Sequence, residues 1–158
     1  MLVVITPANS DSDFVTAREL FCAYADSLPF SLDFQGFQAE LAGLPAPYNP
    51  PAGCLLLARR ERAPVGVAGL KPLAPGIAEI KRLYVVPAAR GAGLGRALAE
   101  RAIAEVRAKG YGCLRLDTHR PSMGTAIALY RRLGFVEIAP YGPDLDGEIA
   151  FFEKRLSE

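Results

Sequence analysis

Apolar residues recur with the period of a helix through much of the first 44 residues, after a short apolar run at Leu2–Thr6 that predicts a strand. The spacing predicts a helix that begins at the candidate N-caps of residues 11–13 and ends near Pro29. A second, shorter helix is expected over residues 34–44. Pro45–Pro51 is then expected to be irregular, because proline neither donates to a strand ladder nor fits inside a helix.

Longer apolar runs follow this proline-rich segment. Cys54–Arg60 and Pro64–Leu73 are separated by a charged turn, and together they predict a β-hairpin. Pro75-Gly76 marks a second turn, which leads into the apolar run Ile77–Val86. The first half of the chain is therefore expected to end in three antiparallel strands.

The second half of the chain alternates helices with strands. A helix is expected before Gly110, a strand over residues 113–118, and a second helix that Ser122 would cap and Gly134 would close. The last strands are expected at residues 135–138 and 148–154, with a polar loop between them. The helical faces comprise Leu94, Leu98, Ala102 and Val106 in the first helix and Ala126, Leu129, Tyr130 and Leu133 in the second. A strand–helix–strand unit joined to antiparallel strands predicts a mixed α/β sheet.

Composition adds limits to this picture. The 158 residues fit a single domain, residues 1–158, and 51% apolar residues suffice for a buried core. A net charge of +1 without a basic run argues against nucleic-acid binding, and no stretch reaches the ~18 apolar residues of a membrane span. Three widely spaced cysteines and one histidine argue against disulfides and a metal site. We expect a cytoplasmic protein, because the N-terminus has no signal-peptide pattern.

Arg90–Arg96 is the most informative segment, with glycine at positions 91, 93 and 95 between two arginines. It follows one predicted strand and precedes one predicted helix. Glycine permits positive φ and leaves no Cβ between the backbone amides and a ligand. A helix that begins there directs free N–H groups and the positive end of its dipole into the loop. The pattern therefore predicts an anion site, most often one for phosphate.

Three phosphorylated ligands and a simple turn compete for this segment. A P-loop for a nucleoside triphosphate is disfavoured, because no lysine lies between Arg82 and Arg107. In a dinucleotide-binding unit Asp117 would bind the ribose, but Arg96 stands where the third glycine belongs and too few residues follow. A loop that merely turns leaves the two flanking arginines unexplained. Coenzyme A is the third ligand.

Two motifs in order resemble those of the GNAT N-acyltransferases. Residues 79–87 followed by Arg90-x-x-Gly93-x-Gly95 resemble the central motif of that family, whose loop pattern is R/Q-x-x-G-x-G/A. Ala126-x-x-x-Tyr130-x-x-x-Gly134-Phe135 resembles its second motif. The resemblance covers nearly the whole chain. It implies an α/β (α+β) fold with a mixed, mostly antiparallel sheet of about six to seven strands flanked by about four helices. It also implies an acetyl-CoA:amine N-acetyltransferase that uses acetyl-CoA and no metal.

The resemblance implies roles for the loop and for the strand before it. The backbone of Leu83, Tyr84 and Val85 would bond the pantetheine amides like an added strand. The pyrophosphate would be bound by the segment Arg90, Gly91, Ala92, Gly93, Leu94, Gly95, Arg96 and Ala97, with the two arginine side chains as candidates for direct pairing. Arg131 and Arg132 could reach the 3′-phosphate. The family often carries Asn seven residues before the tyrosine, and Met123 stands there.

Acetyl transfer to an amine needs an acid for the leaving sulfur and a base for the amine. Tyr130 matches the family's acid, since a phenol keeps its proton at neutral pH; the alternative is a tyrosine of the apolar helix face. Glu79 stands where many members carry a glutamate that deprotonates the amine, often through water. The alternative for Glu79 is an ion pair with Lys81 or Arg82. His119, the single histidine, is expected to be incidental.

The acceptor site is expected between the first two helices and the last polar loop. Tyr24 and Phe34 would supply aromatic walls, Tyr141 could close over the site, and Asp144 or Asp146 could attract a cationic amine. The implied partner is the amine of a small molecule or peptide, with a monomer or homodimer and no nucleic acid or membrane. A non-catalytic coenzyme A-binding sensor or partner module remains the alternative function.

Overall fold

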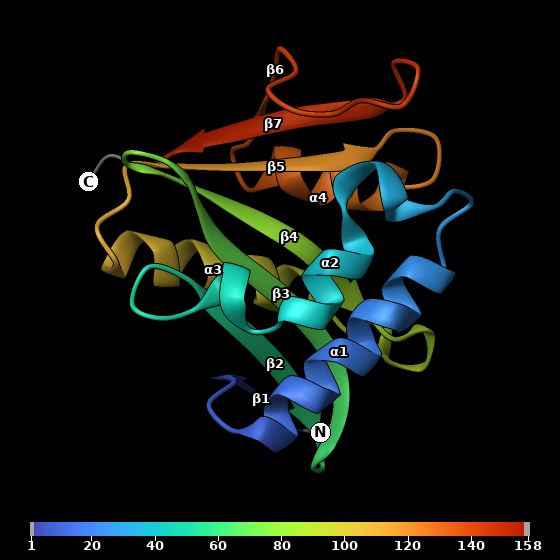
Figure 1. The fold of residues 1–158 in the computed structure, drawn as a ribbon, viewed down its shortest axis with the longest axis vertical. Helices are drawn as coiled ribbons and strands as arrows, with labels where there is room; N and C mark the ends of the chain where they lie inside the picture. The colour runs from blue at the N-terminus through green and yellow to red at the C-terminus, as the bar shows by residue number, and fades with distance from the viewer. Residues whose placement is uncertain (1, 157–158) are drawn as a thin grey trace.

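Seven strands form one sheet in the computed structural model, which describes residues 2–156. The strands are β1 (Val3–Pro7), β2 (Cys54–Arg60), β3 (Ala63–Ala74), β4 (Ile77–Val85), β5 (Cys113–His119), β6 (Val136–Ile138) and β7 (Ile149–Arg155). They lie in the order β1-β2-β3-β4-β5-β7-β6 (Figure 1). β4 and β5 run parallel, and the other neighbouring pairs are antiparallel. The predicted mixed, mostly antiparallel sheet is therefore confirmed.

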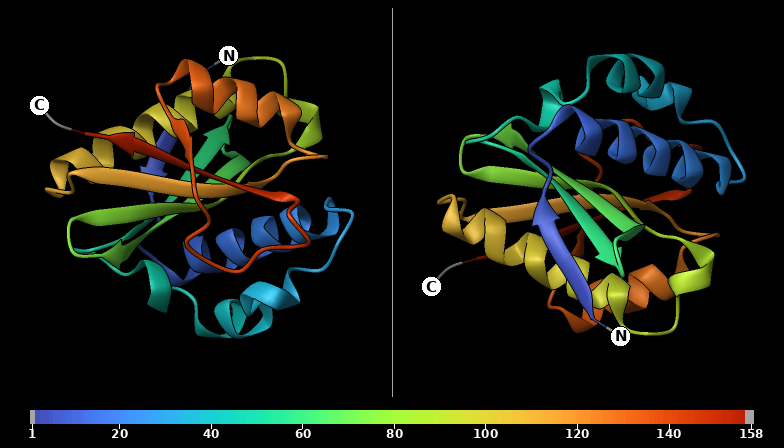
Figure 2. Two further views of the ribbon diagram at one scale, coloured as in Figure 1. Left: turned by 90° about the horizontal axis from the view of Figure 1, so that it is seen from above. Right: turned by 90° about the horizontal axis from the view of Figure 1, so that it is seen from below.

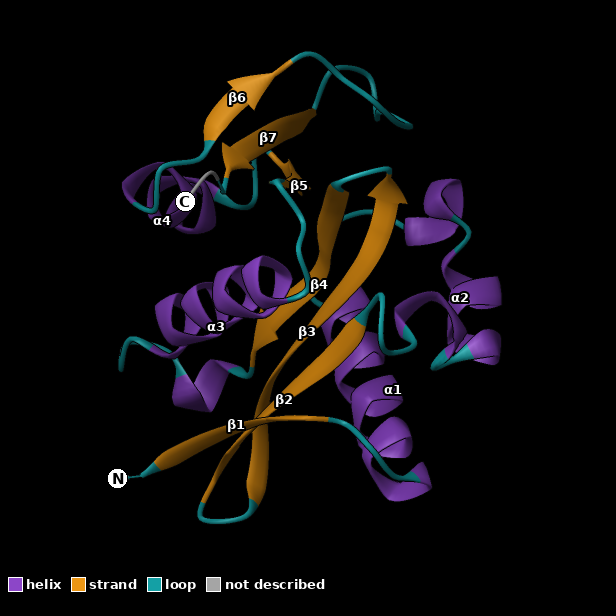
Figure 3. Ribbon diagram, turned by 90° about the vertical axis from the view of Figure 1, so that its left-hand side faces the viewer, coloured by secondary structure: helices purple, strands orange, loops and turns teal. Residues whose placement is uncertain are grey.

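Helices cover both faces of the sheet. In the described part of the chain the α-helices are α1 (Asp11–Asp26), α2 (Phe37–Gly43), α3 (Leu94–Ala108) and α4 (Gly124–Arg132), and the 3-10 helices are η1 (Leu32–Gln35), η2 (Ala46–Tyr48) and η3 (Pro87–Ala89). α1 and α2 lie on one face, and α3 and α4 lie on the other (Figure 2, Figure 3). None of the described helices combines the length and the apolar character that crossing a membrane requires.

The uninterrupted apolar run of β2 contributes to the cores on both faces. Successive side chains of a strand point to opposite sides of the sheet. Leu56 belongs to the apolar cluster that contains Leu98 of α3, whereas Leu55 and Leu57 belong to the cluster that contains Phe21 of α1. A strand that is buried on both faces needs apolar residues at every position, so its sequence does not alternate.

The region of the first two helices differs from the prediction in two places. Ser10 is the N-cap of α1, and its hydroxyl accepts a hydrogen bond from the amide of Asp13 at 3.1 Å. Residues 11–13, the predicted caps, instead form the first helical turn. The predicted helix over residues 34–44 is divided into η1 and α2, because Gly36 between them takes the left-handed conformation with φ 70°.

Two further predictions of local structure were wrong. Ser122 does not cap α4: Met123 is the residue before the helix, and the Ser122 hydroxyl hydrogen-bonds to Nδ1 of His119 at 2.7 Å. The helix begins one residue later than predicted, so Ser122 lies outside the N-cap position. The segment Pro45–Pro51 is not entirely irregular, since η2 forms within it and buries Tyr48 against the sheet. Proline is tolerated in the first turn of such a helix.

Gly53 allows this proline-rich segment to approach β3. A Cβ at this position would lie 2.6 Å from the carbonyl oxygen of Leu70 and 2.9 Å from the carbonyl carbon of Tyr48. We therefore expect Gly53→Ala to lower the free energy of unfolding in urea by about 1–3 kcal/mol, because backbone must shift to admit the methyl group. Gly43→Ala is the control, since a Cβ on this helical residue would meet nothing within 4 Å. Equal stability of the two variants would contradict the close approach.

Candidate active site

The parallel strands β4 and β5 pair over only part of their length. Their ladder ends where Ile80 lies opposite Leu116, although β4 continues to Val85 and β5 continues to His119. Beyond this point, Tyr84 and Val85 keep their partners on β3 but have none on β5 within residues 2–156. The two strands separate, and the free edge of β4 offers backbone N–H and C=O groups to an extended ligand.

One extra residue bends β4 at the start of the opening, directly after the last pair with β5. Lys81 lies opposite Gly69 of β3, and Tyr84 lies opposite Val67, so three steps along β4 match two along β3. Arg82 takes the left-handed conformation in this bulge, with φ 61°. A bulge shifts the alternation of the residues that follow it. Arg82 and Tyr84 consequently both face α1 and α2, where they contact Glu40 and Tyr24.

A cavity of about 530 Å³ extends from this opening to the start of α3. Gly91 and Gly93 in its wall take φ 88° and 78°, which other residues rarely adopt. Gly93 is also the N-cap of α3. Among the lining residues are Tyr24, Leu83, Tyr84, Val85, Arg90, Gly91, Gly93, Leu94, Gly95, Arg96, Met123 and Tyr130. The edge of β4 and the glycine loop therefore share one binding surface.

The loop presents a set of free backbone amides. The amide of Arg90 donates to the carbonyl of Pro87 at 3.2 Å, and the amide of Ala97 donates to the carbonyl of Gly93 at 3.0 Å. The amides between them, from residue 91 to residue 96, make no hydrogen bond to the described residues. Ala92 and Ala97 do not line the cavity. Free amides at a helix N-terminus, with its positive dipole, favour an anion such as phosphate.

The arginines of the loop differ in what they contact. Arg90 donates its Nε–H to the carbonyl of Val85 at 2.9 Å, which holds the loop against the end of β4. Arg96 pairs with Glu100 at 3.1 Å, and about half of each side chain is exposed. An exposed pair of this kind contributes little, so the guanidinium of Arg96 is available to a phosphate. Arg132 at the end of α4 also lines the cavity.

Three tyrosines, Tyr24, Tyr84 and Tyr130, line the cavity with hydroxyl groups that are open to a ligand. The hydroxyls of Tyr130 and Tyr24 make no hydrogen bond to the described residues, and both remain in contact with solvent. Burial raises the pKa of the Tyr130 phenol, with smaller contributions from Tyr24 and Asp117. Burial likewise raises the pKa of Tyr24 to about 12. Both phenols are therefore protonated at neutral pH and can donate a proton or a hydrogen bond.

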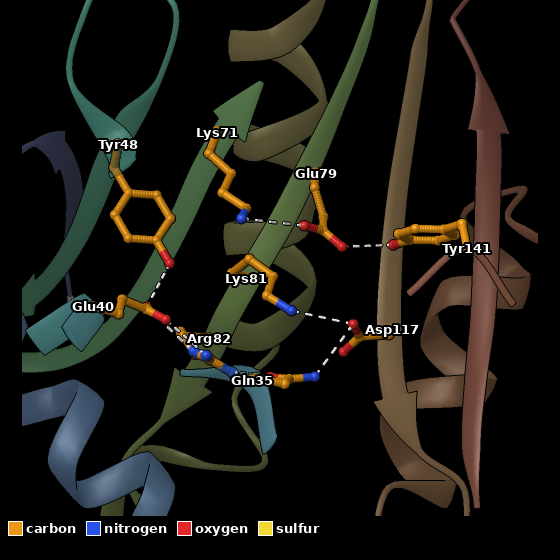
Figure 4. A network of polar contacts seen from close by, with 9 residues as sticks. All are labelled: Gln35, Glu40, Tyr48, Lys71, Glu79, Lys81, Arg82, Asp117 and Tyr141. Carbon is orange, nitrogen blue, oxygen red and sulfur yellow. Dashed lines mark hydrogen bonds and ion pairs between the residues drawn. The ribbon is translucent and has the colours of Figure 1, made fainter. Parts of the chain in front are cut away.

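Glu79 lies deeper, in the paired part of β4 and opposite Arg115. It is 3% exposed, and its Oε2 accepts a hydrogen bond of 2.7 Å from the hydroxyl of Tyr141 (Figure 4). Lys71 of β3 lies 3.9 Å from Oε1. The alternative in which Glu79 pairs with Lys81 or Arg82 is therefore wrong, because Lys81 pairs with Asp117 and the bulge directs Arg82 to Glu40.

Those other carboxylates extend the polar network towards α2. Lys81 Nζ lies 3.1 Å from Asp117 Oδ2 across the gap between β4 and β5. Arg82 donates to Glu40 at 2.7 and 3.3 Å and to Gln35 at 2.6 Å (Figure 4). Gln35 and Glu40 were not among the predicted site residues. The strand part of the network had a signal in the sequence, namely polar residues at alternate positions of two predicted strands, 79 and 81 in one and 115 and 117 in the other.

Only some of the predicted acceptor residues line the cavity. Tyr24 lines the cavity, but Phe34 packs against Phe30 with ring centroids 6.0 Å apart and does not line it. Tyr141 contacts Glu79 instead of the cavity. Asp144 accepts hydrogen bonds from the amides of Leu145 at 2.6 Å and of Ile149 at 3.1 Å, so it stabilises the loop that leads into β7.

Comparisons with known proteins identify the family and the fold of the chain. Residues 17–135 match the model of the acetyltransferase (GNAT) family. An uncharacterized N-acetyltransferase of Schizosaccharomyces pombe is 33% identical, over 99% of this chain and 96% of that protein. A GNAT-family acetyltransferase structure from Staphylococcus aureus superposes with a TM-score of 0.79 at 21% identity, covering 99% of this chain and 100% of that one. A Salmonella typhimurium protein solved with its cofactor acetyl-CoA gives a TM-score of 0.74 at 21% identity, covering 100% and 96%.

Proposed function

Because the chain belongs to the acetyltransferase (GNAT) family of acyltransferase enzymes, we propose that it transfers an acetyl group from acetyl-CoA to the amine of a small molecule or peptide. The amine attacks the thioester directly while both substrates are bound. The observation that carries this proposal is the continuous surface formed by the free edge of β4 and the free amides of the loop. An extended arm that ends in a pyrophosphate matches both parts of that surface.

The coenzyme site proposed here uses both backbone and side chains. The backbone of Leu83–Val85 would bond the amides of the pantetheine arm, and the amides of residues 91–96 would bind the pyrophosphate. Arg96 would turn from Glu100 to a phosphate, and Arg132 is placed to reach the 3′-phosphate. The Salmonella protein with the same fold, which was solved with acetyl-CoA, supports this choice of ligand. The three free thiols support the expected cytoplasmic location.

The proposed mechanism divides proton transfer between two residues. Acetyl-CoA supplies the acyl group as a thioester. The ammonium of the acceptor loses one proton, through a water molecule, to Glu79, which passes it to solvent. The amine nitrogen bonds to the acyl carbon, the carbon–sulfur bond breaks, and Tyr130 gives its proton to the sulfur. The second proton of the nitrogen restores Tyr130, so each turnover produces an amide, free coenzyme A and one proton.

Acetyl-CoA incubated with the protein and a panel of amines tests the proposal. We expect free thiol to appear only when protein and an accepted amine are both present. Coenzyme A, and not NAD, should raise the melting temperature, because a ligand that binds the native state stabilises it. Coenzyme binding without thiol release across the panel would favour a sensor or partner module. Stabilisation by NAD alone would contradict the choice of coenzyme.

A further inference from the structure

Asp117 lies where β4 and β5 separate. It directly follows Leu116, the last residue of β5 that pairs with β4, and its side chain meets that of Lys81 across the gap. Glu79 lies two residues before Lys81 on β4, which is roughly 7 Å farther into the paired part of the sheet. A group that contacts an amine beside the thioester must lie at the opening. Asp117 meets this condition, whereas Glu79 needs an intervening water.

One oxygen of Asp117 is available to a ligand. Both protein contacts go to Oδ2, from Lys81 Nζ at 3.1 Å and from Gln35 Nε2 at 3.5 Å (Figure 4). Oδ1 makes no hydrogen bond to the described residues and remains in contact with solvent. The side chain as a whole is only 15% exposed, and that of Lys81 is 10% exposed. A carboxylate with so little water around it binds an ammonium group more strongly than an exposed one does.

The charge of Asp117 also acts on the cavity. Burial is the main cause of the raised pKa of Tyr130 and of Tyr24, and the charge of Asp117 adds to both effects. Glu79 adds to the raised pKa of Tyr48 and Tyr141, which do not line the cavity, and Asp117 also contributes to the raised pKa of Tyr141. Neither carboxylate lines the cavity itself, but of the two it is Asp117 whose charge acts on Tyr24 and Tyr130.

We propose that Asp117 binds the ammonium group of the acceptor, which approaches the solvent-facing Oδ1 and takes over the carboxylate from the Lys81 ammonium. Lys81 is itself a primary ammonium, and its contact with Asp117 shows the chemistry that this position accepts. Its flexible four-carbon stem allows it to move aside when the acceptor enters. The acceptor class is then an aliphatic primary amine, which is protonated at neutral pH. An uncharged arylamine or alcohol would not compensate for separating Lys81 from Asp117.

This inference rests on the proposed function, and the bonds formed and broken are those given above. Thiol release is first measured for the unmodified protein with acetyl-CoA and two sets of acceptors. One set contains amino acids, polyamines and peptides with free N-termini, and the other contains anilines and alcohols. We expect thiol release with the first set only. Turnover confined to the second set overturns the inference and leaves the proposed function intact, whereas no turnover with either set overturns both.

Four variants then test whether Asp117 binds the acceptor or only stabilises the sheet. Each is assayed with the best amine of the first set. Asp117→Asn should raise the KM for that amine by about 10- to 100-fold and leave the KM for acetyl-CoA unchanged, because it removes one charged hydrogen bond. Lys81→Met should lower the KM for the amine, because a competing ammonium is gone. Glu79→Gln should lower kcat without this change in KM. Lys71→Met, which removes a cation from Glu79, is the matched control and should leave the KM for the amine unchanged.

The opposite directions of the first two variants are decisive. If Asp117 only paired with Lys81 to stabilise the sheet, either substitution would break the same pair, and both would move the KM for the amine in the same direction. That result overturns the inference. Urea unfolding of each variant shows that the comparison is made between folded proteins.

Discussion

Replacing Tyr130 with phenylalanine is expected to lower kcat by about 100- to 10,000-fold, the usual contribution of a positioned general acid. The KM for acetyl-CoA should change little, because the coenzyme site proposed here uses the edge of β4 and the loop amides. The leaving thiolate would then have to depart without a proton or take one from water.

The Tyr130→Phe substitution removes the hydroxyl without disturbing other contacts of the side chain. The Tyr130 hydroxyl makes no hydrogen bond to the described residues, so its removal leaves no unpaired partner behind. The ring packs edge-on against Phe135, with centroids 5.6 Å apart, and phenylalanine keeps this contact. The raised pKa of the phenol keeps the proton in place across the neutral range, so loss of the hydroxyl removes a donor that is present in every molecule.

Tyr24→Phe is the matched control. Tyr24 lines the same cavity, also has an unbonded hydroxyl, and is expected to contribute its ring as a wall. The kcat of the Tyr24→Phe variant should therefore stay close to that of the unmodified protein. Thiol release at saturating acetyl-CoA, measured for both variants, gives the comparison. An unchanged kcat for Tyr130→Phe, or equal losses for the two variants, would contradict the assignment of Tyr130 as the acid.

The cavity wall proposed to bind the coenzyme could be predicted from the sequence because its signals are local. An apolar strand, alternate glycines and the start of a helix follow one another within residues 83–96, and each acts through backbone conformation over a few residues. The structure places these residues around the cavity, and α3 begins at Leu94 as the pattern indicates. The order of strands and helices was accessible for the same reason, since periodicity is a local property.

The acceptor side could not be predicted in the same way. Whether Asp117 lies at the opening depends on the register of β4 against β5, which joins residues more than 30 positions apart. The direction of Arg82 depends on a bulge, and a bulge is not visible in the pattern of apolar residues. For this reason the sequence suggested Lys81 or Arg82 as partners of Glu79, whereas the structure pairs them with Asp117 and Glu40.

Replacing Glu40 with leucine is expected to lower the free energy of unfolding by about 3–5 kcal/mol, because it leaves the buried charge of Arg82 without its partner. Glu40 is the only carboxylate among the described residues that pairs with Arg82, whose side chain is 3% exposed. It also accepts a 2.6 Å hydrogen bond from the hydroxyl of Tyr48, a residue that is 1% exposed. One substitution therefore removes the acceptor of two buried donors.

Glu100→Leu is the control for this prediction, because Glu100 also pairs with an arginine at about the same distance. That pair is about half exposed, so its loss should cost less than about 1 kcal/mol in the same urea titration. The double variant Glu40→Leu/Arg82→Met removes both buried charges, and we expect it to be more stable than Glu40→Leu alone.

The same pair contacts the bulge that lies at the start of the β4–β5 opening. Arg82 has a positive φ that an arginine rarely adopts, and such a conformation persists when surrounding contacts determine it. In Glu40→Leu we therefore expect the KM for acetyl-CoA to rise together with the loss of stability, since Tyr84 and Val85 follow the bulge directly. If Glu40→Leu and Glu100→Leu unfold at the same urea concentration, the buried pair does not stabilise this part of the sheet.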